Sequence, residues 1–369
     1  MRFKREHKRL VAAVAAATLV MAACGDDDSD DSAADEAESA ATEAMDDAET
    51  AATDAMEETD STDGGDEAAT GDFECETALN DDNSVESISE LDFSGVDVTV
   101  GSKDFTEQFV LGALAVVAME EAGANVDNQL NLGGTVVNRD ALLAGEIDTY
   151  WEYNGTGWTV HLGRDDPSFD RAELTNDVCV TDLEENNIRW IGVSEFNDTY
   201  GFATAGDSPA AGLDLQGMME YVNENSDATV CMEDEYPSRP DGLVLVENAT
   251  GLTIPESQIE ILDTGPIYEE TASGNCTFGE IFTTDGRIPA LGLDVVEDPG
   301  IHILYNVSLT MPDDVYQQAP DQFEALADTI LAGLDNDTMA ELNRQVDEDG
   351  EEWLDVARNY LTEQGLIGG

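Results

Sequence analysis

Hydrophobic and polar positions in the second part of the chain follow two periods, one typical of strands and one typical of helices. Residues 96–100 alternate as a strand does, and residues 101–103 predict a turn. Asp104 with Glu107 three residues later has the spacing of a capping box. This pattern predicts a helix that runs to Glu121.

Strand-like and helix-like segments then alternate to the end of the chain. Thr135 is expected to cap a helix that ends at Gly145. Further strands are predicted at residues 146–150, 228–233, 258–263 and 278–283, and closing helices at residues 321–333, 337–345 and 351–364. The alternation indicates an α/β protein with mostly parallel sheets, and its length suits two domains better than one.

The start of the chain has a different character. Residues 1–23 predict an export signal, because a basic start precedes an apolar run that is shorter than the ~20 residues needed to span a bilayer. The run ends in small residues before Cys24, which is similar to the lipidation site of bacterial lipoproteins; an ordinary signal with a chance cysteine is the alternative. Residues 24–91 are expected to form an acidic, disordered tether that follows the lipidated cysteine.

The chain is strongly acidic, with 14 basic and 83 acidic residues and a formal net charge of −69. Without residues 1–23, 9 basic and 82 acidic residues remain, which gives −73. Such a surface repels nucleic acid and anionic lipid, so no nucleic-acid partner is expected, and membrane contact only through the lipid. Self-repulsion of this size is relieved by salt, which indicates a salt-loving source.

Four cysteines besides Cys24 are expected in an oxidising compartment, where three pairings are open. The favoured pairing is Cys231–Cys276 with Cys75–Cys179, and free buried cysteines are the alternative. Their spacing does not suit metal ligands, so neither a metal site nor a cofactor is expected.

Enzyme chemistry finds little support in the sequence. Histidine occurs only at His7, His161 and His302, and the last two are expected to be ordinary solvated or capping residues. The motifs of serine hydrolases, zinc proteases and phosphate-binding loops do not occur. The protein is therefore not expected to be an enzyme.

Two features favour binding of a small charged ligand. Lys103, the one lysine after the signal, lies in a turn before a helix N-terminus, which suits an anion; pairing with a neighbouring acid is the alternative. Tyrosines at 150 and 153 lie where a strand is expected to end, and a tyrosine face attracts a cation by ~0.5–2 kcal/mol. For Trp151 and Trp158, packing in the core is favoured over ligand binding.

An ordered set of motifs gives these features a context. The first is Gly101-Ser102-Lys103-Asp104-Phe105-Thr106-Glu107-Gln108, and others follow at residues 133–135, 150–157, 196–200, 238–243, 284–288 and 341–347. Each block is weak alone, but the ordered set, spread over residues 96 to 366, resembles the glycine betaine/choline substrate-binding proteins of ABC importers.

The resemblance implies a fold of the type II periplasmic-binding-protein kind. Two lobes are expected, joined by a hinge that the chain crosses twice. Lobe 1 would comprise residues 92–200 plus 306–369, and lobe 2 residues 201–305.

It also implies which side chains hold the ligand. An aromatic box for a quaternary ammonium would consist of Tyr153, Tyr200, Phe282 and Tyr305, with a full negative charge on Asp198 beside the cation. The carboxylate of a zwitterion would be held by Lys103, Thr156 and Arg239. Relatives usually have tyrosine where this chain has Phe282. Arg287 is either a second anion contact or, more in keeping with its position, a brace of the turn between the lobes.

The function implied is that of an exported lipoprotein on the outer face of the cell membrane. It would capture a small zwitterionic or cationic solute, such as glycine betaine, for the permease and ATPase of an ABC importer. Choline or carnitine specificity is one alternative, and a sensory or structural lipoprotein with the same clamp is another.

Overall fold

The computed structural model describes residues 75–80 and 82–368. The expected export signal, the lipidated Cys24 and the tether up to residue 74 lie outside the described residues. Within the described part, no helix has both the length and the apolar character needed to cross a bilayer.

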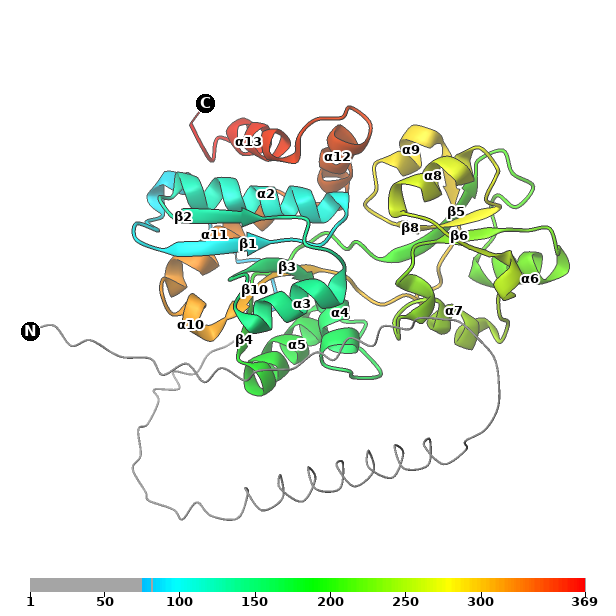
Figure 1. The fold of residues 1–369 in the computed structure, drawn as a ribbon, viewed down its shortest axis with the longest axis horizontal. Coiled ribbons are helices and arrows are strands. Elements are labelled where there is room, and N and C mark those ends of the chain that lie inside the picture. Colours follow the sequence, from blue (N-terminus) through cyan, green and yellow to red (C-terminus); the bar gives the residue numbers. More distant parts are fainter. Residues whose placement is uncertain (1–74, 81, 369) are drawn as a thin grey trace, which may run out of the picture. The chain divides into compact units, whose positions relative to one another are not determined.

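The described elements form two subdomains, shown in Figure 1. The first contains a two-stranded sheet, β1–β2, and a three-stranded sheet of order β3–β10–β4. Its strands are β1 (Asp97–Gly101), β2 (Asn125–Gln129), β3 (Tyr150–Tyr153), β4 (Ile188–Ile191) and β10 (Val307–Pro312). Its helices are η1 (Ile88–Glu90), α2 (Thr106–Glu121), α3 (Thr135–Ala144), α4 (Asn154–Thr156), η2 (Gly157–His161), α5 (Arg171–Asn186), α10 (Asp313–Tyr316), α11 (Pro320–Leu331), α12 (Asn336–Asp347) and α13 (Trp353–Glu363).

The second subdomain is built on one five-stranded sheet of order β7–β6–β8–β5–β9. Its strands are β5 (Tyr200–Ala205), β6 (Val230–Met232), β7 (Ile259–Ile261), β8 (Phe278–Phe282) and β9 (Leu293–Val295). Its helices are α6 (Leu215–Glu224), η3 (Tyr236–Ser238), α7 (Leu243–Thr250), η4 (Glu256–Gln258), α8 (Thr264–Ala272) and α9 (Arg287–Leu291).

The chain crosses between the subdomains twice, before β5 and before β10. Both of these strands run antiparallel to their neighbours. Strand β5 pairs with β8 and β9, and strand β10 pairs with β3 and β4. The pairs β1–β2, β6–β7 and β6–β8 are parallel. The α/β class is as predicted, but the sheets contain both parallel and antiparallel pairs. The chain enters β5 and β10 from the other subdomain rather than through the helical crossover that a parallel pair needs.

Helix α2 is the central helix of the first subdomain. Every residue from Val110 to Met119 is buried, as in a helix that is apolar on all sides. The indole of Trp151 donates to the carbonyl oxygen of Leu111 at 2.9 Å, which locks β3 against this helix. Trp151 therefore belongs to the core, in line with the interpretation favoured from the sequence.

Two helix starts differ from the prediction. Phe105, not Asp104, is the N-cap of α2, and no side chain caps this end. The expected capping box is absent because the Glu107 carboxylate accepts hydrogen bonds from buried hydroxyl groups instead. At α3 the N-cap is Gly134 and Thr135 is the first helical residue, whereas the predicted end at Gly145 is correct.

The predicted strand at residues 146–150 is also displaced. Strand β3 begins only at Tyr150 and runs to Tyr153, because its partner β10 pairs with these four residues. The displacement brings Tyr153 to the end of the strand.

The predicted tether extends too far, because residues 75–80 and 82–91 are part of the fold. Cys75 is bonded to Cys179 of α5. Val85 donates a backbone hydrogen bond to the Thr329 hydroxyl, and the Ile88 side chain is completely buried. Cys231 and Cys276 form the second disulfide, so both bridges follow the pairing favoured from the sequence.

Candidate ligand-binding site

A cavity of about 850 Å³ is lined by residues of both subdomains. The lining includes every side chain that the sequence predicts to contact a ligand: Lys103, Tyr153, Thr156, Asp198, Tyr200, Arg239, Phe282 and Tyr305. The fold brings them together because β3 and β8 end, and β5 begins, at this cavity.

Four aromatic rings gather at one part of the cavity. The Tyr200 ring lies 5.2 Å from Phe282 and 5.3 Å from Tyr305, centroid to centroid. Tyr153 lies 6.2 Å from Tyr305. The three tyrosines are almost completely buried, whereas Phe282 is partly exposed.

A fifth ring, Phe105, was not assigned to the site from the sequence. It stacks nearly parallel to Phe282 at 5.3 Å and to Tyr153 at 6.2 Å. Phe105 also lines the cavity, at the N-cap of α2. The available signal was its place inside the first motif, two residues after Lys103.

The phenol groups of two tyrosines are fixed by carboxylates. Tyr153 donates to Glu107 at 2.9 Å, and Tyr305 donates to Asp241 at 2.8 Å. Burial raises the pKa of both phenols well above its usual value, so they stay neutral. The ring faces are therefore positioned by bonds at the ring edges.

Glu107 and Asp198 form a buried acidic pair. The Thr284 hydroxyl lies 2.5 Å from Glu107 Oε2 and 2.5 Å from Asp198 Oδ1. Burial, and for Asp198 the neighbouring Glu107, raises the pKa of both carboxyls. Two such close buried acids favour sharing a proton in the ligand-free protein, and the full negative charge expected on Asp198 beside a bound cation stays a prediction.

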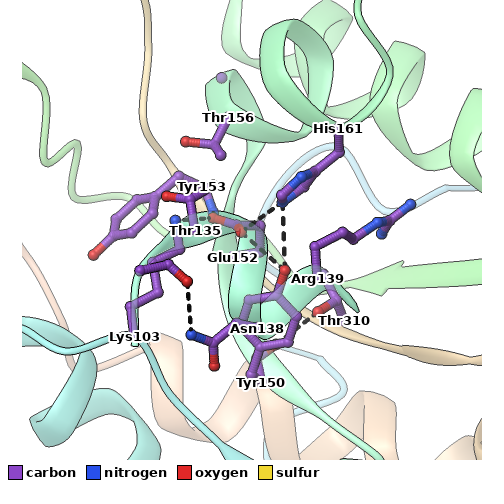
Figure 2. Close-up of polar contacts among 12 residues, drawn as sticks. Lys103, Thr135, Asn138, Arg139, Tyr150, Glu152, Tyr153, Thr156, His161 and Thr310 are labelled. Carbon is purple, nitrogen blue, oxygen red and sulfur yellow. Dashed lines mark hydrogen bonds and ion pairs between the residues drawn. The ribbon is translucent and has the colours of Figure 1, made fainter. Parts of the chain in front are cut away.

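Lys103 is paired with an acid inside the protein, as Figure 2 shows. Its Nζ lies 2.6 Å from Oε1 of Glu152, a fully buried carboxylate at the end of β3. Burial alone would raise the pKa of Glu152, but Lys103 and His161 hold it well below its ordinary value. Lys103 also lies 5.0 Å from the Tyr153 ring centroid, so this cation reaches the aromatic cluster.

The two histidines of the described chain are buried rather than solvated. His161 Nε2 lies 2.8 Å from Glu152 Oε2, beside Tyr150, which donates to the same oxygen (Figure 2). His302 lies between Asp298 and the Tyr236 hydroxyl. The expectation of ordinary solvated or capping histidines is wrong, because both side chains are buried and each ring contacts other side chains.

Arg239 links the subdomains across the cavity. From the second subdomain, its guanidinium donates to Thr135 and Thr156 of the first, each at 3.1 Å. Asp241 accepts two further bonds at 2.8 Å, and Glu235 accepts one at 3.2 Å. All five N–H groups of the guanidinium are therefore used.

Arg287 has the position of a brace. Its guanidinium pairs with Asp285 and, at 3.3 Å, with Asp347 of α12 in the first subdomain. It also stacks on the Tyr268 ring at 4.3 Å. These contacts match the bracing role that the sequence favoured over anion contact.

The chemistry of the cavity suits binding of a cation. Aromatic faces and buried carboxylates converge there, and ring faces attract a cation that has no N–H to donate. Among the described residues, no group of three or more His, Cys, Asp and Glu side chains has the arrangement of a metal site.

Comparisons with known proteins point to one family. The family described as the substrate binding domain of the ABC-type glycine betaine transport system matches residues 96–363. A glycine-betaine-binding protein of Pseudomonas aeruginosa is 30% identical over 278 residues, which cover 73% of this chain and 88% of the relative. The glycine betaine-binding protein YehZ of Escherichia coli is 28% identical over 279 residues, 73% of this chain and 90% of that protein.

The solved structure of apo YehZ from Escherichia coli superposes with a TM-score of 0.56 at 28% identity, over 73% of this chain and 99% of that one. Family members are solute-binding proteins rather than enzymes. The match over most of the chain shows that this protein belongs to the family of substrate-binding domains of ABC-type glycine betaine transport systems.

Proposed function

We propose that the protein captures a quaternary-ammonium solute of the glycine betaine class and presents it to the permease of an ABC importer. The observation that carries this proposal is the meeting of Tyr153, Tyr200, Phe282 and Tyr305 in one cavity beside two buried acids. The trimethylammonium group would lie against these ring faces, with Phe105 as a further wall.

The chemistry explains why rings suit this ligand. A quaternary nitrogen has no N–H, so hydrogen bonds do not select it. Its methyl groups share the positive charge and are attracted to the faces of aromatic rings. Each contact is worth ~0.5–2 kcal/mol, most when water is excluded. Three rings that are 3–6% exposed meet that condition.

The polar part of the solute would lie at the anion end of the cavity, where the Arg239 guanidinium is 5.6 Å from the Tyr200 ring centroid. Thr156 and Arg239 lie there, with Lys103 nearby, and these are the groups that we propose for a ligand carboxylate. Each already has a partner in the protein, so a ligand carboxylate would exchange with an existing contact.

We further propose that residues 92–200 with 306–369 and residues 201–305 act as lobes that close on the solute. The separate sheets of the two parts, and the crossings before β5 and β10, support this division. We also keep the proposals of export and of a lipid anchor at Cys24, which would hold the protein at the outer face of the membrane.

A screen of thermal unfolding tests the binding function. Glycine betaine, proline betaine, choline and carnitine are added at several salt concentrations, with glycine as a control that has the carboxylate but no methylated nitrogen. A ligand at a hundred times its Kd stabilises the folded form by about 2.7 kcal/mol, so at least one quaternary ammonium compound should raise Tm. Equal shifts with glycine, or no shift with any compound, would contradict the proposal.

A further inference from the structure

We propose that Glu235 is a built-in occupant of the anion end of the cavity, so that the site favours quaternary ammonium ions with a net positive charge over zwitterions. This inference rests on the proposed function and specifies the class of solute. It concerns the part of the cavity around Glu235 and Arg239, where the Arg239 guanidinium lies 5.6 Å from the Tyr200 ring centroid.

The Glu235 carboxylate reaches from the second subdomain to the first. Oε1 accepts a hydrogen bond of 3.1 Å from the backbone N–H of Thr135, the first residue of α3. Oε2 accepts a bond of 3.2 Å from Arg239. One carboxylate thus joins a helix N-terminus to a buried guanidinium.

The backbone of the first subdomain leaves room for this carboxylate. A Cβ atom on Gly134 would fall 2.2 Å from Glu235 Oε1, so any other residue at position 134 would displace the acid. The free N–H groups and the dipole at the start of a helix favour an anion. Glu235 therefore fills a place whose surroundings match a carboxylate.

Each basic side chain that lines the cavity already has an acid as partner. Lys103 pairs with Glu152, Arg239 with Asp241, and Arg287 with Asp285. The five N–H groups of Arg239 donate to Asp241, Glu235, Thr135 and Thr156. A carboxylate on a ligand would have to displace one of these partners to gain a bond from Arg239.

The balance of charge on the lining points the same way. Nine acidic residues line the cavity against three basic ones. A second carboxylate next to Glu235 would meet like charge, whereas a cation with a hydroxyl tail would not. Choline has such a tail, and glycine betaine has a carboxylate.

Calorimetric titration of choline and glycine betaine into three proteins tests the inference. These are the natural protein, the variant Glu235→Gln and the control variant Asp234→Asn. Asp234 lines the same cavity and carries the same charge, but it is exposed and lies one residue away. The natural protein should bind choline more tightly than glycine betaine.

In Glu235→Gln the affinity for glycine betaine should rise about tenfold relative to that for choline, which corresponds to about 1.4 kcal/mol. Asp234→Asn should change both affinities by a similar, small factor. An unchanged ratio in Glu235→Gln, or an equal loss for both ligands, would overturn the inference and make Glu235 a brace between the subdomains. If the natural protein bound none of choline, glycine betaine, proline betaine and carnitine, the proposed function would be refuted, and this inference with it.

Discussion

Two buried carboxyl groups, Glu107 and Asp198, share the single hydroxyl of Thr284. A hydroxyl carries one hydrogen, so it donates to one of the two acids and accepts from the other only if that acid is protonated. Tyr153 and Asn343 also donate to Glu107, which leaves Asp198 as the acid with fewer donors. The pair therefore holds a proton next to the proposed cation position.

This pair predicts a pH dependence of binding. The folded-state pKa of both acids is raised, first by burial, so their contribution to the stability of the ligand-free protein is present at low pH and lost as pH rises through those values. A cation in the cavity favours the charged acids, so choline affinity should increase with pH and binding should release protons. Calorimetry in two buffers of different ionisation enthalpy measures that release.

Asp198→Asn is the matched variant for this experiment, because it keeps the shape of the side chain and removes one titrating group. Its choline affinity should depend less on pH. Proton uptake on binding, or an affinity that is flat with pH in the natural protein, would contradict the shared proton.

Phe105 gives a second prediction at the scale of a residue. Replacing it by leucine removes a ring that stacks on Phe282 and Tyr153, and should weaken choline binding by about 0.5–1.5 kcal/mol. Phe169, which is 56% exposed and does not line the cavity, provides the control Phe169→Leu. Equal affinities of the two variants would exclude Phe105 from the site.

The eight residues that the resemblance assigned to the ligand all line one cavity, and only the ordered motifs pointed to them. Composition and spacing alone left Lys103 open between an anion contact and a pair with an acid. Glu235 was missed because its contact with Thr135 spans 100 residues of sequence, and nothing local indicates which helix end it reaches. Glu107 was misread because its spacing from Asp104 matched a local cap, whereas its partners lie in other parts of the chain.

At the scale of elements, the prediction was best where the signal is local. The closing helices α11, α12 and α13 lie within a few residues of their predicted ranges. The directions of β5 and β10 were not predictable from periodicity, because strand direction depends on the connection rather than on the strand. The start of β3 was displaced for a similar reason, since pairing with β10 selects residues 150–153.

The segment that joins the predicted tether to the fold provides a prediction at this scale. The disulfide Cys75–Cys179 closes a loop of 104 residues, for which loss of loop-closure entropy predicts about 4.7 kcal/mol of stability. The double variant Cys75→Ser with Cys179→Ser should lose stability of this order in urea unfolding. A loss below about 1 kcal/mol would show that the packing of Ile88 and Val85 holds the segment without the bridge.

At the scale of the whole molecule, net charge dominates. The chain has a formal charge of −69, and repulsion between its acidic groups opposes the compact state. Salt screens this repulsion, because the Debye length falls from about 10 Å at 0.1 M to about 3 Å at 1 M. The Tm should therefore rise from 0.1 to 2 M sodium chloride. A Tm that is constant or falls over this range would show that the acidic surface does not require salt.

The division into two subdomains is what brings the site together. Tyr153 lies in the first subdomain, Phe282 in the second and Tyr200 at the first crossing between them, and their rings come together because the chain crosses twice. This arrangement was inferred from the resemblance and not from the hydrophobic pattern, which is compatible with other two-domain α/β proteins.

The most direct test of the account is calorimetric titration of choline beside its neutral isostere, 3,3-dimethylbutan-1-ol. The two molecules have nearly the same shape and hydroxyl group, but only choline carries the charge that ring faces attract. Choline should bind saturably, and the isostere should bind at least tenfold more weakly. Equal binding of both, or no binding of choline, would contradict it.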